Sequence, residues 1–195
     1  CRTATEWRSL TRLVSAGHLE ESHDKPRVDR ELLKQHRNSL IALSAGPKGE
    51  VGRLLNAGRS DLAQEAAEWL GALFRDETSG APGFYLELHR HGEPDEESLI
   101  QQTVTLAHQL NLPLVASNDV HFIDRKDHRA HDALICIGTG FTLMDEKRPR
   151  INDRRHFATP EEMATLFADL PEALDNTLQI AKRCSFRLEL GKTVL

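Results

Sequence analysis

The stretch at residues 112–123, LPLVASNDVHFI, constrains the fold of this chain more than any other. A proline opens it, a short apolar run fills residues 114–116, and a polar cluster ends it. Such a run between punctuating residues predicts a buried strand of a parallel sheet. In α/β proteins, ligands bind beyond the carboxyl ends of these strands. Asp119 and His121, which follow the run, are therefore candidate site residues.

Asp119 and His121 lie two positions apart, so on an extended backbone their side chains would point the same way. A carboxylate and an imidazole that converge in this manner suit a divalent metal or an acid–base pair. A second interpretation stays open. An aspartate after a strand often caps the next helix, and a nearby histidine is often a surface residue that only forms hydrogen bonds.

Two further segments, at residues 40–44 and 84–89, also predict strands. Helical periodicity precedes and separates the three strands, at residues 4–17, 29–33, 49–55, 60–74 and 95–110. Helices are also expected at residues 127–137, from 159 onward and at 171–184. Alternation of helix and strand favours parallel strands with crossover helices, and hence an α/β fold. Three strands are too few for a closed barrel, so we expect the chain to be an excerpt that lacks an amino-terminal part.

Two of the predicted helices have apolar residues on one face, which we expect to be buried. In the first helix this face consists of Trp7, Leu10, Leu13 and Val14. In the helix at residues 127–137 it consists of Ala130, Ala133, Leu134 and Ile137.

Several residues are placed to begin helices. Asp29 is a candidate N-cap, and either Ser60 or Asp61 would cap the helix that reaches residue 74. Thr159 and Glu162 have the spacing of a capping box, with Pro160 at the first helical position. These local patterns fix where we expect the helices to start.

Composition excludes some classes of function. The formal net charge is −5, so no overall positive field points to nucleic acid. The three cysteines are far apart and form no C-x-x-C pair, which favours a reducing compartment over a disulfide framework or a zinc finger. No apolar run is long enough to span a bilayer, so we expect no membrane partner and a cytoplasmic location. The charged loop at residues 145–155 is expected to be a solvated surface, although its basic excess could contact a phosphate backbone.

Three segments carry a resemblance to a known family: YLELHRHGEPDEESL, LPLVASNDVHFIDRKDHRAHDALICIGTGFTL and EEMATLFADLPEALDNTLQIAKRC. Together with upstream segments in the same order, they resemble the bacterial replicative DNA polymerase III alpha subunit. The matching part is the later portion of its amino-terminal polymerase-and-histidinol-phosphatase (PHP) domain. The resemblance implies a partial, distorted parallel (β/α) barrel with a carboxyl-terminal helical extension. Residues 1–145 would belong to the PHP domain, and residues 146–195 would form a loop and helices that lead toward the polymerase palm.

The resemblance also implies a metal site at the carboxyl ends of the strands, with zinc or manganese as the ion. Asp119 and His121 fall on its last pair of ligands. One position departs from the family: its cysteine ligand corresponds here to Gly46, which has no side chain to coordinate a metal. Two ligands alone make a poor divalent site, since hydrolytic zinc usually has three protein ligands.

The function implied is that of a fragment of a DNA-directed DNA polymerase, with Mg²⁺ as its cofactor. Primer–template DNA, deoxynucleoside triphosphates and other replicase subunits would be its partners. The fragment itself would contain no catalytic residue of polymerisation and would have a structural role, with a partly degenerate metal site. Two alternatives remain: an active metal-dependent 3′–5′ exonuclease or phosphoesterase, and a purely non-enzymatic scaffold.

Overall fold

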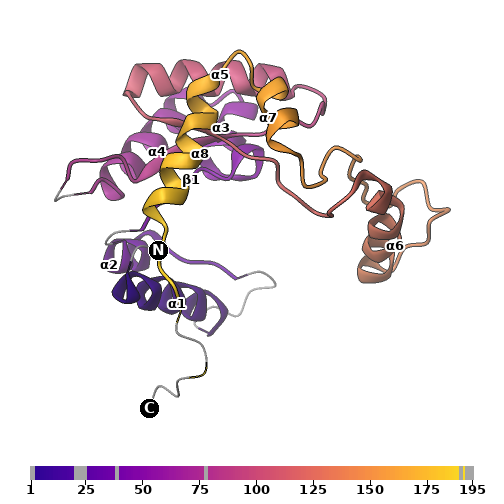
Figure 1. Cartoon of the computed structure of the whole chain (residues 1–195), viewed down its shortest axis with the longest axis horizontal. Coiled ribbons are helices and arrows are strands. Elements are labelled where there is room, and N and C mark those ends of the chain that lie inside the picture. The colour runs from indigo at the N-terminus through magenta and orange to yellow at the C-terminus, as the bar shows by residue number, and fades with distance from the viewer. Residues whose placement is uncertain (1–2, 20–25, 38–39, 77–78, 189–190, 192–195) are drawn as a thin grey trace.

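The computed structural model describes residues 3–19, 26–37, 40–76, 79–188 and 191. Its elements, in chain order, are α1 (Ala4–Leu19), α2 (Arg30–His36), β1 (Ala42–Leu43), η1 (Gly46–Lys48), α3 (Glu50–Asn56), α4 (Ser60–Leu73), β2 (Phe84–Leu88), α5 (Glu96–Leu110), β3 (Leu114–Ala116), η2 (Arg125–Asp127), α6 (His128–Thr139), α7 (Pro160–Leu166) and α8 (Pro171–Arg183). The alternation expected from the sequence is therefore confirmed (Figure 1). His23, which we expect at the surface, and Cys1 lie outside the described residues.

The three strands form one parallel sheet in the order β1-β2-β3. Ala42 pairs with Phe84, and Leu86 pairs with Leu114. The sheet is open, with β1 and β3 at its edges, so the described strands form an α/β sheet and not a closed barrel. Because all three strands run the same way, their carboxyl ends meet at one edge, which is where the sequence predicts the site.

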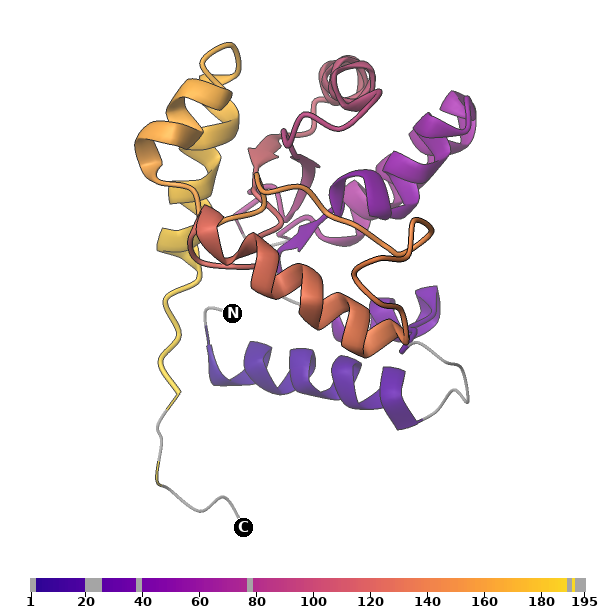
Figure 2. The ribbon, with the colours of Figure 1, turned by 90° about the vertical axis from the view of Figure 1, so that its right-hand side faces the viewer.

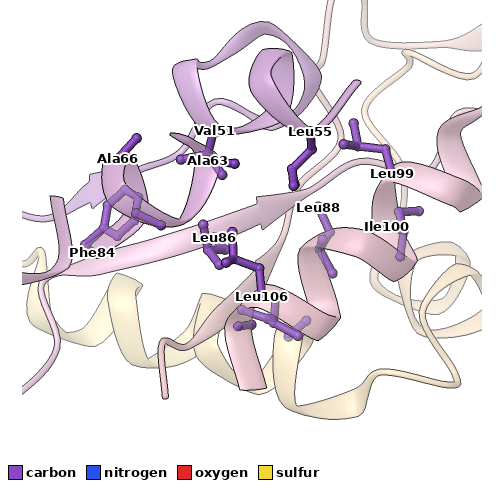
Figure 3. Close-up of a cluster of buried hydrophobic side chains, with 14 of the residues drawn as sticks. Val51, Leu55, Ala63, Ala66, Phe84, Leu86, Leu88, Leu99, Ile100 and Leu106 are labelled. Atoms are coloured by element: carbon purple, nitrogen blue, oxygen red, sulfur yellow. The ribbon is translucent and has the colours of Figure 1, made fainter. Parts of the chain in front are cut away.

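The core lies where α3, α4 and α5 meet strand β2 (Figure 3). Phe84, Leu86 and Leu88 alternate along β2, and all three are almost fully buried. Tyr85 is buried as well, because α8 covers the sheet and the Arg183 guanidinium donates a hydrogen bond to the Tyr85 hydroxyl. Burial on both faces is typical of a central parallel strand.

Local capping patterns are confirmed at two helices. The Asp29 carboxylate accepts a hydrogen bond from the backbone N–H of Leu32 at 2.7 Å. Thr159 and Glu162 form the reciprocal capping box at the start of α7. The prediction for α4 is wrong, because Arg59 occupies the N-cap position and provides no side-chain cap.

The predicted burial of the α1 face is largely wrong. Leu13 is buried, but Trp7, Leu10 and Val14 are all more than one-third exposed. The reason is that α1 packs against the short helix α2, away from the sheet (Figure 2). A seven-residue helix covers only part of a sixteen-residue one.

Helix α6 also departs from expectation. Its predicted inward face is exposed at Leu134 and Ile137, while Cys136 on the other side is buried. In Figure 1 this helix lies to one side of the sheet and not over it.

In the described part of the chain, none of the helices combines the length and the apolar character that a membrane span requires.

Candidate functional site at the carboxyl ends of the strands

Three loops meet at the carboxyl edge of the sheet and form what we call the rim: residues 44–48 after β1, 89–91 after β2 and 117–121 after β3. Two non-glycine residues of the rim, Ala45 and Asp119, have positive φ angles of 60° and 38°. Such conformations cost free energy in L-residues and concentrate at functional sites. The rim is therefore the first place to look for chemistry.

Asp119 is the centre of an ion-pair cluster on the rim. Its Oδ2 atom accepts a hydrogen bond from Lys48 Nζ at 2.8 Å and another from Arg155 Nη1 at 2.5 Å. Lys48 is largely exposed, whereas only 11% of the Arg155 side chain is accessible to solvent. The carboxylate therefore forms ion pairs with one surface cation and one mostly buried cation.

The structure brings His121 and Asp119 together, as the sequence predicts, but by a different geometry. His121 Nε2 lies 3.7 Å from Asp119 Oδ2. The chain here is not an extended strand, because Asp119 adopts a left-handed conformation. Instead, the His121 backbone N–H donates to the Arg155 carbonyl at 2.9 Å, which fixes the segment against a distant loop. Asp119 does not begin a helix, so the capping alternative is wrong.

The charges of this cluster shift the pKa values of Asp119 and His121. Burial alone would raise the pKa of Asp119, but the hydrogen bond from Lys48 and the positive charges of Lys48 and Arg155 lower it from 3.8 to about 2. Burial lowers the pKa of His121 below its usual value; the negative charge of Asp119 opposes this shift, and the positive charges of Lys48 and Arg155 add to it. At neutral pH, Asp119 is thus ionised and His121 is neutral.

A second cluster lies deeper, between the strands. Glu87 Oε1 accepts a hydrogen bond from the Ser117 hydroxyl at 2.5 Å and lies 3.5 Å from His89 Nε2. The Ser44 hydroxyl accepts from the Glu87 backbone N–H at 2.8 Å. Burial would raise the pKa of Glu87, but the contacts with His89 and Ser117 lower it. Glu87 thus joins all three strand ends, through its carboxylate to Ser117 and through its backbone N–H to Ser44.

His91 and Glu96 form a third cluster at the same edge. The His91 ring is almost fully buried; its Nε2 lies 2.8 Å from the Asn118 carbonyl and its Nδ1 lies 3.4 Å from Glu96. Glu96 also accepts hydrogen bonds from the backbone N–H groups of His91 and Gly92, both at 2.7 Å. These contacts join the loop after β2 to the first turn of α5 and to the loop after β3.

A cavity of about 430 Å³ opens beside the rim. Glu87, His89, His91 and Arg155 contribute to its wall. Gly46, which corresponds to the family's cysteine ligand, also borders it, with φ +50°. A Cβ atom at this position would lie 2.8 Å from the His89 ring, so a side chain there would require His89 to move.

The residues present do not fit a resident metal ion in this arrangement. The Asp119 oxygen nearest His121 is already shared by Lys48 and Arg155, whose positive charges would repel a divalent cation. Among the described residues, no three His, Cys, Asp or Glu side chains are placed to hold a metal together. Metal ligation by Asp119 and His121 therefore stays a prediction from the sequence.

Sequence reasoning missed the two cations. Lys48 follows the strand at residues 42–43 by five positions, so the same strand-end rule that identified Asp119 could have identified it. Arg155 belongs to the loop that we expected to be solvated, and 36 residues separate it from Asp119. No local pattern connects those two positions.

Comparisons with known proteins relate the sequence of this chain to one group of proteins. Residues 1–91 match the family model described as the PHP domain. The chain is 42% identical over 98% of its length to DNA polymerase III subunit alpha of Pseudomonas aeruginosa and of Escherichia coli K12. It is 41% identical over 97% of its length to the subunit of that name from Haemophilus influenzae. The chain spans 16% of the length of each of these relatives. Almost the whole chain therefore matches one region of DNA polymerase III alpha subunits, and its first 91 residues match the PHP domain.

Proposed function

We propose that this chain is a segment of a bacterial replicative DNA polymerase that extends primer–template DNA with deoxynucleoside triphosphates. The observation that carries the proposal is 42% identity across almost the whole chain to alpha subunits of DNA polymerase III. The complete protein would use Mg²⁺, act in the cytoplasm and assemble with other replicase subunits. The polymerising carboxylates would lie outside this chain, since phosphoryl transfer requires a carboxylate cluster that holds two metal ions.

Within that protein, residues 1–145 would form the later part of a PHP domain and residues 146–195 would lead toward the palm. The open sheet would then be part of a distorted parallel barrel, completed by strands that belong to another part of the polypeptide. Exposure of Leu43 on the edge strand β1 supports this, because an uncovered edge strand is available for further pairing.

The rim itself would serve as a structural joint. Asp119 and His121 would be the remainder of a metal site, in which Lys48 and Arg155 now supply the positive charge. Three features support this role: the shared Asp119 oxygen, the mostly buried Arg155 side chain, and Glu87, whose carboxylate and backbone N–H together join the three strand ends. Each contact links segments far apart in sequence, which is what a scaffold requires.

The test of this function is primer extension by the full-length polypeptide that contains the chain. It should extend a primed template when given Mg²⁺ and all four deoxynucleoside triphosphates, whereas the 195-residue chain alone should not. The variant Asp119→Ala of the full-length protein should retain its specific activity at temperatures where it remains folded. Absence of extension by the full-length protein, or extension by the short chain, would contradict the proposal.

A second candidate is a metal-dependent 3′–5′ exonuclease or phosphoesterase. The observation in its favour is that Glu87, His89 and His91 line a cavity of about 430 Å³ beside the rim. Lys48 and Arg155 would have to leave Asp119 for a metal to enter. Trimming of DNA 3′ ends by the full-length protein, abolished both by a chelator and by Asp119→Ala, would establish this activity; unchanged trimming in the variant would exclude the site.

A further inference from the structure

The outward face of α6 is an apolar surface without a partner among the described residues. Ala130, Leu134 and Ile137 repeat at helical spacing, and Phe141 continues the row just beyond the helix. Leu134 is 63% exposed and Ile137 is 79% exposed. Side chains spaced by four and three positions share one side of a helix, so Ala130, Leu134 and Ile137 form one row, with which we group the exposed Phe141 that follows the helix. We call it the α6 stripe.

The orientation of α6 is fixed from its opposite side. Cys136 is buried there, and Asp132 forms an ion pair with Arg148 in which both side chains are nearly inaccessible to solvent. His128 Nε2 lies 2.8 Å from the Ile151 carbonyl, which also ties the helix to the following loop. These contacts hold the stripe outward, so its exposure is a property of the fold and not of a freely rotating helix.

Two further apolar residues are exposed in the loop that follows the helix. Leu143 is 45% exposed and Met144 is 89% exposed. None of these six side chains has a nitrogen or oxygen atom that could form a hydrogen bond with water. Contiguous exposed apolar surface of this kind marks an interaction site in a soluble protein. Permanently covered interfaces are the most apolar, because they resemble a core cut in two.

The occupant that best fits is another part of the same polypeptide. The relatives carry 84% of their length outside the region matched here, since the chain spans 16% of them. A covalently linked segment meets the stripe at high effective concentration and covers it from the time of folding. An all-apolar stripe without polar anchors suits such a permanent contact better than a transient one.

We propose that the α6 stripe, with Leu143 and Met144, docks on an apolar surface of the polypeptide that follows residue 195 in the full-length protein. This inference rests on the proposed polymerase function, which supplies that polypeptide. The α6 stripe would then be the contact that fixes this PHP segment against the remainder of the enzyme.

The experiment uses single cysteine variants of the full-length protein and thiol alkylation. Leu134→Cys and Ile137→Cys probe the stripe. Thr139→Cys is the matched control, because Thr139 is exposed on the same helix, two positions from Ile137 and therefore on another face. Native Cys136 lies in the same tryptic peptide, residues 130–147, as the three test positions. Tandem mass spectrometry therefore assigns each label to its residue from the fragment ions. We expect both stripe positions to react at least about tenfold more slowly than position 139, with each rate normalised to that of the urea-unfolded variant.

A photo-crosslinking residue at position 137 then identifies what covers the stripe. Crosslinks to peptides beyond residue 195 of the same molecule support the proposal. Crosslinks to a second copy or to another subunit overturn it, and so does equal alkylation at positions 134, 137 and 139. Primer extension is measured on the same preparations. Active enzyme with an accessible stripe would refute the docking alone, whereas a protected stripe in an inactive protein would refute the proposed function alone.

Discussion

Replacing Asp119 by asparagine removes the charge on which Lys48 and Arg155 converge, while the side chain keeps its size. The variant leaves the mostly buried Arg155 with only the more distant carboxylate of Glu93, at 3.7 Å. Loss of an ionised partner is expected to destabilise the folded state, because the remaining charge keeps its desolvation penalty. The rim of the sheet should therefore be less stable in the variant at neutral pH.

The magnitude follows from the titration of Asp119. A pKa lowered from 3.8 to about 2 corresponds to about 2.4 kcal/mol of stabilisation by the ionised form. Solvent screens part of this, because the side chain of Lys48 is 65% exposed. We therefore expect Asp119→Asn to lower the free energy of unfolding by about 1 to 2 kcal/mol at pH 7.

The pH dependence gives a sharper test than the magnitude. Because the folded-state pKa is lower than the unfolded one, the stabilisation by Asp119 is fully present above about pH 5 and is lost as the pH falls toward 2. At pH 3, about half of it should remain. The difference in unfolding free energy between wild type and Asp119→Asn should shrink accordingly.

Urea unfolding of both proteins between pH 3 and pH 7 measures this difference. The matched control is Asp153→Asn, an exposed aspartate in the same loop as Arg155, which should change the unfolding free energy by less than about 0.5 kcal/mol at every pH. A difference for Asp119→Asn that stays constant over this range would refute the ion-pair explanation of the rim.

The two cations should contribute differently to stability, because only the arginine is mostly buried. In urea unfolding, Arg155→Met should lower the free energy of unfolding by about 2 to 3 kcal/mol and Lys48→Met by less than about 1 kcal/mol. Equal losses would show that burial does not decide the contribution. Glu96→Ala should cost about 2 to 4 kcal/mol at pH 7, because two backbone N–H groups lose their acceptor. Burial would raise the pKa of Glu96, but the hydrogen bonds to its carboxylate lower it. The stabilisation by Glu96 should therefore be present at neutral pH and be lost in acid. A loss of unfolding free energy in Glu96→Ala that grows on acidification would exclude this explanation. Thr159→Ala should cost about 1 kcal/mol through loss of the capping box, whereas Thr165→Ala, later in the same helix, should cost less than about 0.5 kcal/mol; similar melting temperatures for the two variants would argue against the cap.

The parallel sheet could be predicted from the sequence because the patterns that indicate its strands and crossover helices are local. Each strand is a short apolar run between punctuating residues, and each crossover helix has its own period. Phe84, Leu86 and Leu88 alternate as expected, and Asp29 and Thr159 cap as expected. These features depend on neighbours within a few positions, so a single chain suffices to predict them.

What the sequence did not predict depends on tertiary placement. The apolar faces of α1 and α6 have the right period, but Ile137 is 79% exposed, and Trp7 is still 38% exposed although its ring lies 6.3 Å from that of Phe186. Periodicity identifies an apolar face without identifying its partner. Arg155 likewise reaches Asp119 only because the loop after α6 returns to the rim, where Phe157 N–H donates to the Phe122 carbonyl and a parallel bridge joins Phe122 to His156.

We propose that ion pairs of Asp119 with Lys48 and Arg155, and not a bound metal, hold the rim together. Elemental analysis of the full-length protein, purified without chelator and then dialysed against metal-free buffer, tests it most directly, with Asp119→Ala as the comparison. We expect no zinc or manganese that is retained by the wild type and lost in the variant. One or more such ions per chain, retained through dialysis and lost on replacing Asp119, would contradict the account.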